Sequence, residues 1–291
     1  PILMPLHQSL AANQIESIVG ILNGTTNYIL SQMTETGVNY ANALADAQKQ
    51  GFAEADPTND VCGFDAARKL AILSSIGFRA NVTFDDVLVE GIEKIDKSDI
   101  QYAKDMGYTI KLLTVALRQE NGIALNVYPA FLPDNHPLSS VKGAYNAIYV
   151  TGNIVDDVMF YGRGAGALPT ASAVMGDVIS TAQHILNGST GTGMIMTDTK
   201  RIPFYSSLKL QNSYYFRLDV DDVTGVLSQI AAAFAENDIS ICEVVQKRKT
   251  KGLAELVLIT ELASRESILQ VEKGLQVLPC MRKVANVIRV M

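Results

Sequence analysis

The last eighty residues follow an order of strands and helices that few folds can satisfy. Strand-like and helix-like runs succeed one another as YYFRLDV, a helix over residues 225–237, ISICEVVQKR, LAELVLITEL, a helix over residues 264–275, and VANVIRV. The order βαββαβ in so short a segment is that of a ferredoxin-like split βαβ fold. We therefore predict such a domain at the carboxyl end of the chain.

A change of composition separates this domain from the rest of the chain. Residues 187–211 begin with NGSTGTG and continue as a polar, irregular stretch, which is typical of a linker. We place the boundary near residues 205–213. The predicted division is a first domain over residues 1–205 and a second over residues 206–291, with the linker in the second. The full length of 291 residues suits two domains.

The upstream region groups its helices and its strands separately, which favours an α+β fold with a mixed or antiparallel sheet. The predicted helices include one capped by Thr25 or Thr26 and others over residues 40–50 and 98–106. Strand-like runs lie in residues 15–22 and 108–132, the latter interrupted by a turn at Glu120-Asn121-Gly122, and in NAIYVTG and VDDVMFYG. A long helix is predicted from near Pro169 to about Asn187.

Charge and cysteine usage exclude several classes of protein. The chain has 24 Lys and Arg against 30 Asp and Glu, a net charge of −6, which disfavours nucleic-acid and membrane partners. Cys62, Cys242 and Cys280 are widely spaced and odd in number, so neither a disulfide framework nor a zinc site is expected. The three histidines have no metal-ligand spacing. We expect a cytoplasmic protein without a metal site.

The densest polar cluster lies in GFAEADPTNDVCGFDAARKLAIL. Asp65 and Lys69 are four residues apart on a predicted helix and therefore share one face. An aspartate beside a lysine keeps the lysine charged and directed, which suits proton transfer to an oxygen that develops negative charge. Glu54, on the preceding loop, could hold a substrate ammonium group. The alternative is a surface salt bridge beside a solvated acidic loop.

Three turns offer backbone N–H groups near the start of a helix. In NGTTNY, residues 23–28, these groups could receive a carboxylate, or the residues could simply cap the helix. GRGAGA, residues 162–167, matches GxGxxA but lacks the βαβ unit of a dinucleotide fold, so it indicates only a close approach of backbone to some ligand. DVTGVL, residues 222–227, could bind a small acid or be a simple loop.

Three ordered stretches carry a family resemblance: GILNGTTNYIL, GFAEADPTNDVCGFDAARKLAIL and GRGAGALPTASAVMGDVI. With the residues around them, over positions 1–200, they resemble homoserine dehydrogenase. The resemblance implies NAD(P)-dependent interconversion of L-homoserine and L-aspartate 4-semialdehyde, a step toward threonine, methionine and isoleucine. The resemblance also favours an active site over a surface salt bridge as the interpretation of the acidic segment that contains Lys69.

The resemblance implies a role for each matching residue. Lys69 corresponds to the proton donor and acceptor at the substrate oxygen, Asp65 to its orienting partner and Glu54 to the ligand of the substrate amino group. Family positions near the substrate are occupied in this sequence by Gly24, Thr25 and Asp60. The family's loop that closes on the nicotinamide is represented here by Gly164, Ala165 and Gly166. One departure is Phe52, where members of the family often have tyrosine.

The family also begins with a Rossmann domain that carries GxGxxG and a second functional lysine, and these 291 residues contain no such segment. We therefore expect that NAD(P) is bound mainly by a domain absent from this chain. The family's sodium site is expected to be absent as well, because its glycine-rich segment would lie just before Pro1.

Residues 213–291 resemble ACT domains, which pair side by side and bind amino acids at a strand–helix turn. This implies L-threonine as a feedback effector near Asp222, Gly225 and Val226, with Thr224 where proline is frequent, and a homodimer or higher homo-oligomer. The alternative to an enzyme is a non-catalytic, dimerising module that senses amino acids.

Overall fold

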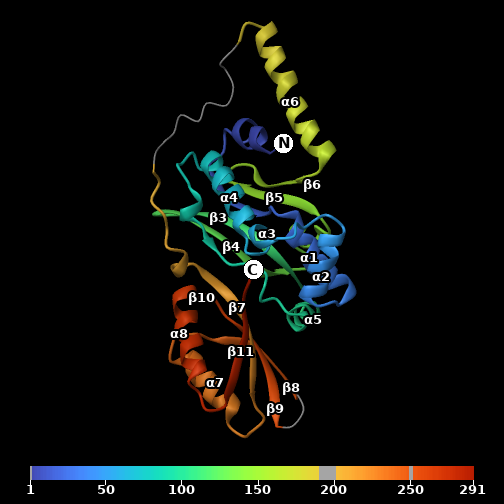
Figure 1. The fold of residues 1–291 in the computed structure, drawn as a ribbon. Helices are drawn as coiled ribbons and strands as arrows, with labels where there is room; N and C mark the ends of the chain where they lie inside the picture. The colour runs from blue at the N-terminus through green and yellow to red at the C-terminus, as the bar shows by residue number, and fades with distance from the viewer. Residues whose placement is uncertain (1, 190–200, 249–251) are drawn as a thin grey trace. The chain divides into compact units, whose positions relative to one another are not determined.

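A computed structural model describes residues 2–189, 201–248 and 252–291 (Figure 1). The chain forms two compact units. Unit 1 consists of Pro1–Glu93, Leu112–Tyr128 and Ser140–Tyr205, and unit 2 consists of Lys94–Lys111, Pro129–Ser139 and Ser206–Met291. Residues 190–200 of the predicted linker lie outside the described residues.

Unit 1 has a largely antiparallel sheet with helices packed on it. Its strands are β1 (Ile15–Ile21), β2 (Leu88–Val89), β5 (Tyr145–Gly152), β6 (Asp156–Arg163) and parts of β3 (Tyr108–Gln119) and β4 (Gly122–Pro133). Its helices are α1 (Gly24–Thr36), α2 (Tyr40–Lys49), α3 (Thr58–Val61), α4 (Phe64–Gly77) and α6 (Ala167–Leu186). The strand order is β6-β5-β1-β3-β4, and β2 pairs in parallel with β4. The short turns are a π-type turn at Pro5–Ser9 and a 3-10 turn at Phe84–Asp86.

The core of unit 1 lies where α4 packs on β1 and α1 packs on β5. Ile18 of β1, Leu30 of α1 and Leu70 of α4 are completely buried. The apolar face of each helix is thereby removed from water, as an amphipathic helix requires. Their burial fixes the loops that follow β1 and precede α4, which carry the candidate site.

Helix α6 is an exception to this packing. None of its residues is buried, and several of its large apolar side chains are more than half exposed, among them Leu168, Val174 and Ile185. Gly166 precedes the helix with φ of 115°. Only glycine adopts that backbone conformation without strain, so the start of α6 depends on it.

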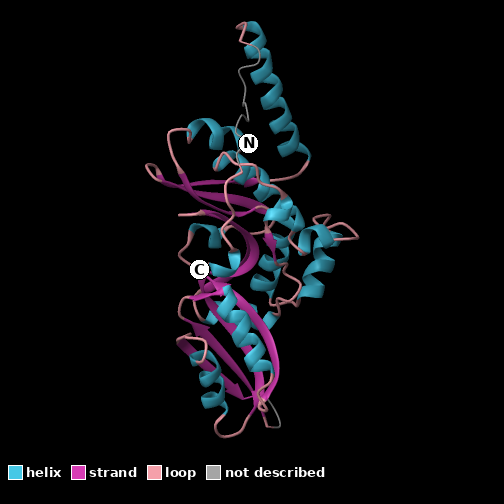
Figure 2. Cartoon of the chain, turned by 90° about the vertical axis from the view of Figure 1, so that its left-hand side faces the viewer, coloured by secondary structure: helices cyan, strands magenta, loops and turns pink. Residues whose placement is uncertain are grey.

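Unit 2 has the strand order β11-β7-β9-β8, with short β10 paired to β7. Its elements are α5 (Lys97–Asp105), β7 (Gln211–Asp221), α7 (Val226–Ala235), β8 (Ile241–Arg248), β9 (Leu253–Thr260), β10 (Ala263–Ser264), α8 (Arg265–Gln276) and β11 (Met281–Val290), with 3-10 turns at Pro137–Ser140 and Ser207–Lys209. Helices α7 and α8 lie together on one face of the sheet (Figures 1 and 2). This is the predicted βαββαβ order, and the α+β class is confirmed.

The two faces of strand β7 have opposite chemistry because successive side chains alternate. Phe216 and Leu218 join the apolar core beneath α7 and α8. Tyr215 and Arg217 instead contact Asp99 of α5. Helix α5 therefore belongs to the same compact unit as the carboxyl-terminal strands, although the chain reaches it before β3.

None of the helices within the described residues is long and apolar enough to cross a membrane.

Candidate active site

Helix α4 presents Asp65 and Lys69 on one side. Lys69 Nζ lies 2.7 Å from Asp65 Oδ2 and donates to the carbonyl oxygen of Leu22 at 3.1 Å. The two side chains are 45% and 31% exposed, lysine first. An ammonium group has three protons to donate, and two of them are engaged here. The third is available to a ligand that enters from solvent.

Gly63 determines where α4 begins. It has φ of 83°, and a Cβ at this position would lie 3.1 Å from the methyl carbons of both Val127 and Val89. A side chain would therefore meet backbone strain and crowding together. The close approach of β2 and β4 at Gly63 places Asp65 in the first turn of the helix.

Asn23 joins three segments of the site: the turn before α1, helix α3 and the first turn of α4. Its side-chain amide donates to Asp60 Oδ1 at 2.7 Å and to Asp65 Oδ2 at 2.9 Å. Its side-chain oxygen accepts the backbone N–H of Thr26 at 2.8 Å, so Asn23 is also the N-cap of α1. The prediction that Thr25 or Thr26 caps this helix was wrong. Asparagine is among the strongest N-cap residues, and that preference was the available signal.

The start of α1 packs closely against its neighbours. A Cβ on Gly24 would lie 3.0 Å from the carbonyl oxygen of Ala144, which explains why glycine stands there. Thr25 donates its hydroxyl to the carbonyl oxygen of Phe52 at 2.6 Å. Gly24 and Thr25 thus stand in the first turn of a helix, where the backbone N–H groups and the helix dipole favour an anion.

Glu54 lies on an exposed loop beside these residues. Gln48 donates its side-chain amide to the carbonyl oxygens of Glu54 and Ala55 at 3.0 and 3.3 Å, which holds the backbone of the loop. The Glu54 carboxylate has no hydrogen bond or ion pair with the described residues. The structure therefore links Asp60, Asp65 and Lys69 in one network and leaves Glu54 outside it.

Aromatic packing holds the loop at Phe52. Its ring centroid lies 4.5 Å from that of Tyr28, whose hydroxyl donates to Asp46 Oδ2 at 2.6 Å. This hydrogen bond, followed by burial, raises the pKa of Tyr28 to about 12. The phenol stays protonated at neutral pH and acts as a donor to Asp46.

Cys62 follows α3 directly and contacts Glu93. The thiol lies 3.2 Å from Glu93 Oε2. Burial, and then the hydrogen bond with Glu93, raise the pKa of Cys62 to about 11. A thiol that remains protonated is a poor nucleophile, and this one acts as a donor to Glu93.

The loop with Gly164, Ala165 and Gly166 is exposed and lies against Asn146 of β5. A Cβ on Gly164 would lie 2.8 Å from Asn146 Cγ, and one on Gly24 would lie 3.5 Å from Asn146 Oδ1. The side chain of Asn146 therefore separates the turn at Gly24 from the loop at Gly164. No sequence motif pointed to Asn146, because only the pairing of β5 with β1 and β6 brings it there.

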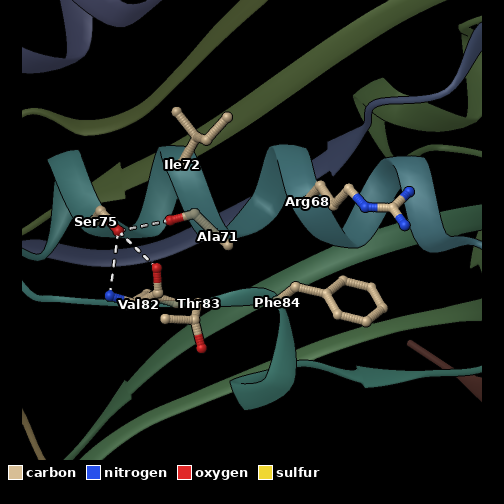
Figure 3. Close-up of a pocket in the computed structure, with 7 residues that line it drawn as sticks. All are labelled: Arg68, Ala71, Ile72, Ser75, Val82, Thr83 and Phe84. Atoms are coloured by element: carbon tan, nitrogen blue, oxygen red, sulfur yellow. Dashed lines mark hydrogen bonds between the residues drawn. The ribbon is translucent and has the colours of Figure 1, made fainter.

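The opposite side of α4 has different chemistry. Figure 3 shows a shallow groove whose lining is mostly apolar, from residues of α4 and of the segment after it: Arg68, Ala71, Ile72, Ser75, Val82, Thr83 and Phe84. Arg68 stacks over the ring of Phe84 at 5.1 Å and donates to Asn59 at 3.1 Å. The groove contains no carboxylate or lysine, so the candidate chemistry lies on the side with Lys69.

The turn after β7 is the predicted effector position in unit 2. Gly225 has φ of 87° and precedes α7, and Val226 is buried as the first residue of that helix. Asp222 donates its backbone N–H to the carbonyl oxygen of Gly252 at 2.8 Å. These contacts fix a strand–helix turn with a helix N-terminus.

Within the described residues, no three His, Cys, Asp or Glu side chains lie close enough to hold a metal ion. The fold and the site together define a class of protein: an α+β domain with a lysine–carboxylate centre, and a ferredoxin-like βαββαβ domain.

Comparison with known proteins identifies the family. The family model for homoserine dehydrogenase matches residues 1–179, and that for the ACT domain matches residues 214–280. The homoserine dehydrogenase of Corynebacterium glutamicum is 41% identical over 99% of this chain and 65% of its own length, and that of Bacillus subtilis is 39% identical over 100% and 67%. The chain belongs to the homoserine dehydrogenase family.

Solved structures agree with this assignment. A homoserine dehydrogenase from Thiobacillus denitrificans superposes with a TM-score of 0.93 at 36% identity, covering 100% of this chain and 67% of that one. A hyperthermophilic archaeal homoserine dehydrogenase mutant in complex with NADPH has a TM-score of 0.52 at 27% identity, covering 63% and 52%. The chain thus spans about two thirds of the length of the curated relatives it matches.

Proposed function

We propose that this chain supplies the substrate-binding and regulatory part of a homoserine dehydrogenase, which interconverts L-homoserine and L-aspartate 4-semialdehyde with NAD(P). The observation that carries the proposal is the geometry of Lys69. Its ammonium group is directed by Asp65 at 2.7 Å and Leu22 O at 3.1 Å, and one donor is left for a ligand. This geometry lies in the segment that the family model matches.

Each side chain of the site has a part in this proposal. Lys69 gives a proton to the aldehyde oxygen as the substrate is reduced and receives it back from the hydroxyl in the reverse direction. Asp65 directs the lysine, and Asn23 holds Asp65 and Asp60 in place. The free carboxylate of Glu54 binds the substrate ammonium group.

The carboxylate of the substrate is assigned to the start of α1, where Gly24 and Thr25 stand. Helix N-termini bind carboxylates through their backbone N–H groups. Glu54, the start of α1 and Lys69 then match the ammonium, carboxylate and hydroxyl groups of one amino acid, in that order.

The nicotinamide is assigned to the side of the site formed by Gly164, Ala165 and Gly166. Two observations fit this group: Gly164 leaves no room for a side chain, and Gly166 adopts a backbone conformation that requires glycine. A flat ring can therefore approach the backbone closely. When bound, the nicotinamide supplies or accepts the hydride. We assign only this end of the dinucleotide to this chain.

The remaining parts of the proposal concern regulation and organisation. Residues 1–205 form the catalytic domain, and residues 206–291 form the ACT domain with its linker. L-Threonine binds at the turn of Asp222, Gly225 and Val226 as a feedback effector. The protein is a cytoplasmic homodimer or higher homo-oligomer, and the exposed apolar side chains of α6 offer surface for contacts.

The test compares Lys69→Ala with Arg68→Ala. Arg68 is the neighbouring exposed cation on α4 and points to the opposite groove (Figure 3). Absorbance of the reduced nicotinamide is followed with L-homoserine and NAD or NADP, in this chain and in the chain joined to the dinucleotide-binding domain of a relative. We expect Lys69→Ala to lower turnover about 10²- to 10⁴-fold and Arg68→Ala to leave it unchanged.

Thermal melting of both variants shows that the loss does not arise from unfolding. Full turnover in Lys69→Ala would contradict the mechanism. An absence of turnover in the joined protein, with amino-acid binding retained, would favour a second function, an amino-acid-sensing module, which the ACT match also supports.

A further inference from the structure

Asn146 occupies the junction between the two halves of the proposed site. It lies on β5, beside Gly162 of β6 and next to Ala147, which pairs with Ile21 of β1. Its side-chain amide reaches the turn at Gly24 on one side and Gly164 on the other. It is therefore the side chain that lies between the turn assigned to the substrate and the loop assigned to the nicotinamide.

The amide of Asn146 is available to a ligand. The side chain is half-buried, and it makes no hydrogen bond to any described residue. The nearby Asn23 and Asn27 contrast with it, since Asn23 has two carboxylate acceptors and Asn27 donates to three backbone carbonyls. Burying an amide without a hydrogen-bond partner costs free energy. A ligand that supplies the missing hydrogen bonds recovers part of that cost.

Close packing restricts where this amide can lie. A Cβ on Gly164 would come within 2.8 Å of both Cγ and Nδ2 of Asn146 and within 3.0 Å of Oδ1. The flat face of the amide therefore lies against the Gly164 backbone. A group restricted in this way before the ligand arrives costs little entropy to order on binding.

The chemistry of the amide indicates which group it meets. It presents a donor and an acceptor in one plane, and a primary carboxamide presents the complementary pair. The ammonium, carboxylate and hydroxyl groups of the substrate already have Glu54, the α1 terminus and Lys69. We propose that Asn146 hydrogen-bonds the carboxamide of the nicotinamide ring and so orients the ring toward the substrate. This inference rests on the proposed function.

The direct test observes the Asn146 side chain by NMR. The full chain, labelled with ¹⁵N in asparagine side chains, is titrated with nicotinamide mononucleotide and with its 3-acetylpyridine counterpart, which cannot donate from the carbonyl substituent. The Asn146→Ala variant assigns the signal. We expect nicotinamide mononucleotide to shift the Asn146 signal and to bind about three- to tenfold more tightly than the counterpart, and Asn146→Ala to abolish that preference.

A second test uses Gly164 to displace the amide without changing it. Gly164→Ala should push the Asn146 side chain aside and weaken nicotinamide binding as much as Asn146→Ala does. In the Asn146→Ala background the same substitution should have little further effect, because its clashing partner is gone. Gly162→Ala is the matched control, since a Cβ there meets nothing within 4 Å.

The outcomes separate this inference from the proposed function. Three results would each overturn the role of Asn146. They are an equal loss of nicotinamide affinity from Gly164→Ala in both backgrounds, an equal affinity for the two nucleotides, and an Asn146 signal that does not shift. A shift of that signal with L-homoserine alone would also overturn it. L-Homoserine is titrated into the same sample, so its binding and the effect of Lys69→Ala on turnover report the proposed function independently.

Discussion

The two units each contain an aspartate paired with a cation at the same distance of 2.7 Å, in very different surroundings. In unit 1, Asp65 and Lys69 are 31% and 45% exposed. In unit 2, Asp99 is completely buried and Arg217 is 9% exposed. Distance alone therefore does not distinguish a pair that can do chemistry from one that holds a fold.

The two ion pairs differ in how many of their hydrogen-bonding groups are left without a partner. Asp99 accepts from Arg217, from the Tyr215 hydroxyl at 3.1 Å and from the Asn286 amide at 2.8 Å. Glu255 accepts the Tyr102 hydroxyl at 2.8 Å and lies 3.5 Å from Arg217. Burial alone would lower the pKa of Arg217, but the hydrogen bond with Asp99 raises it overall, so this cation stays charged. Lys69, by contrast, keeps a donor and a path to solvent.

The largest expected effect is on the buried network. Asp99→Ala leaves the Arg217 guanidinium buried without its main partner, and we expect the free energy of unfolding to fall by about 3–5 kcal/mol. Chemical denaturation followed by circular dichroism measures this change. Asp105→Ala is the matched control on α5, since its pair with Lys247 at 3.7 Å is about half exposed and is worth about 0–1 kcal/mol. Equal losses in the two variants would show that burial does not distinguish the pairs.

Local patterns predicted the elements of both units but not the contacts that join distant segments. The strand-like run YYFRLDV and the helical spacing of Asp65 and Lys69 are properties of neighbouring residues, and both predictions hold in the structure. The bond from Asn23 to Asp60 spans 37 positions, and that from Arg217 to Asp99 spans 118. Such pairs depend on how strands order in a sheet, and a single sequence carries no local signal of that order.

Helix α5 illustrates the limit most clearly. Its sequence predicts a short helix, and the structure contains one. The Asp99 side chain accepts the backbone N–H of Asp96 at 2.9 Å and so completes a capping box at the start of this helix. Its role as the centre of a buried network becomes visible only when β7 and β11 place Arg217 and Asn286 beside it.

A smaller effect concerns pH and the tyrosine of the same network. Burial, and then the charge of Asp99, raise the pKa of Tyr215. A raised pKa means that the folded protein keeps a proton that the unfolded chain releases above about pH 10, so this stabilisation is complete below pH 10 and is lost as the pH rises further. The free energy of unfolding is expected to fall by up to about 1.4 kcal/mol for each pH unit above about 10.

Tyr215→Phe should therefore flatten the alkaline part of the stability profile, measured by denaturation from about pH 9 to about pH 11. Tyr28→Phe is the counterpart in unit 1, where a hydrogen bond with Asp46 is the first cause of a pKa of about 12. Both phenols stay largely protonated in the folded protein over this range, so the two variants should flatten the profile by similar amounts. A clearly smaller change for Tyr215 than for Tyr28 would contradict the burial of the Tyr215 phenol.

The smallest effect on stability is expected at the exposed pair, together with a clear loss of activity. Asp65→Asn keeps an acceptor for Asn23 but removes the charge that directs Lys69. An ion pair as exposed as this one contributes about 0–1 kcal/mol, so denaturation should hardly change. Turnover of L-homoserine, measured in the chain joined to a dinucleotide-binding domain, should fall about 10²-fold because the ammonium group is no longer held toward the substrate. Lost stability with full turnover would assign this pair to the fold, as in unit 2. Lost turnover with retained stability would instead show that an exposed pair with a spare donor serves the reaction.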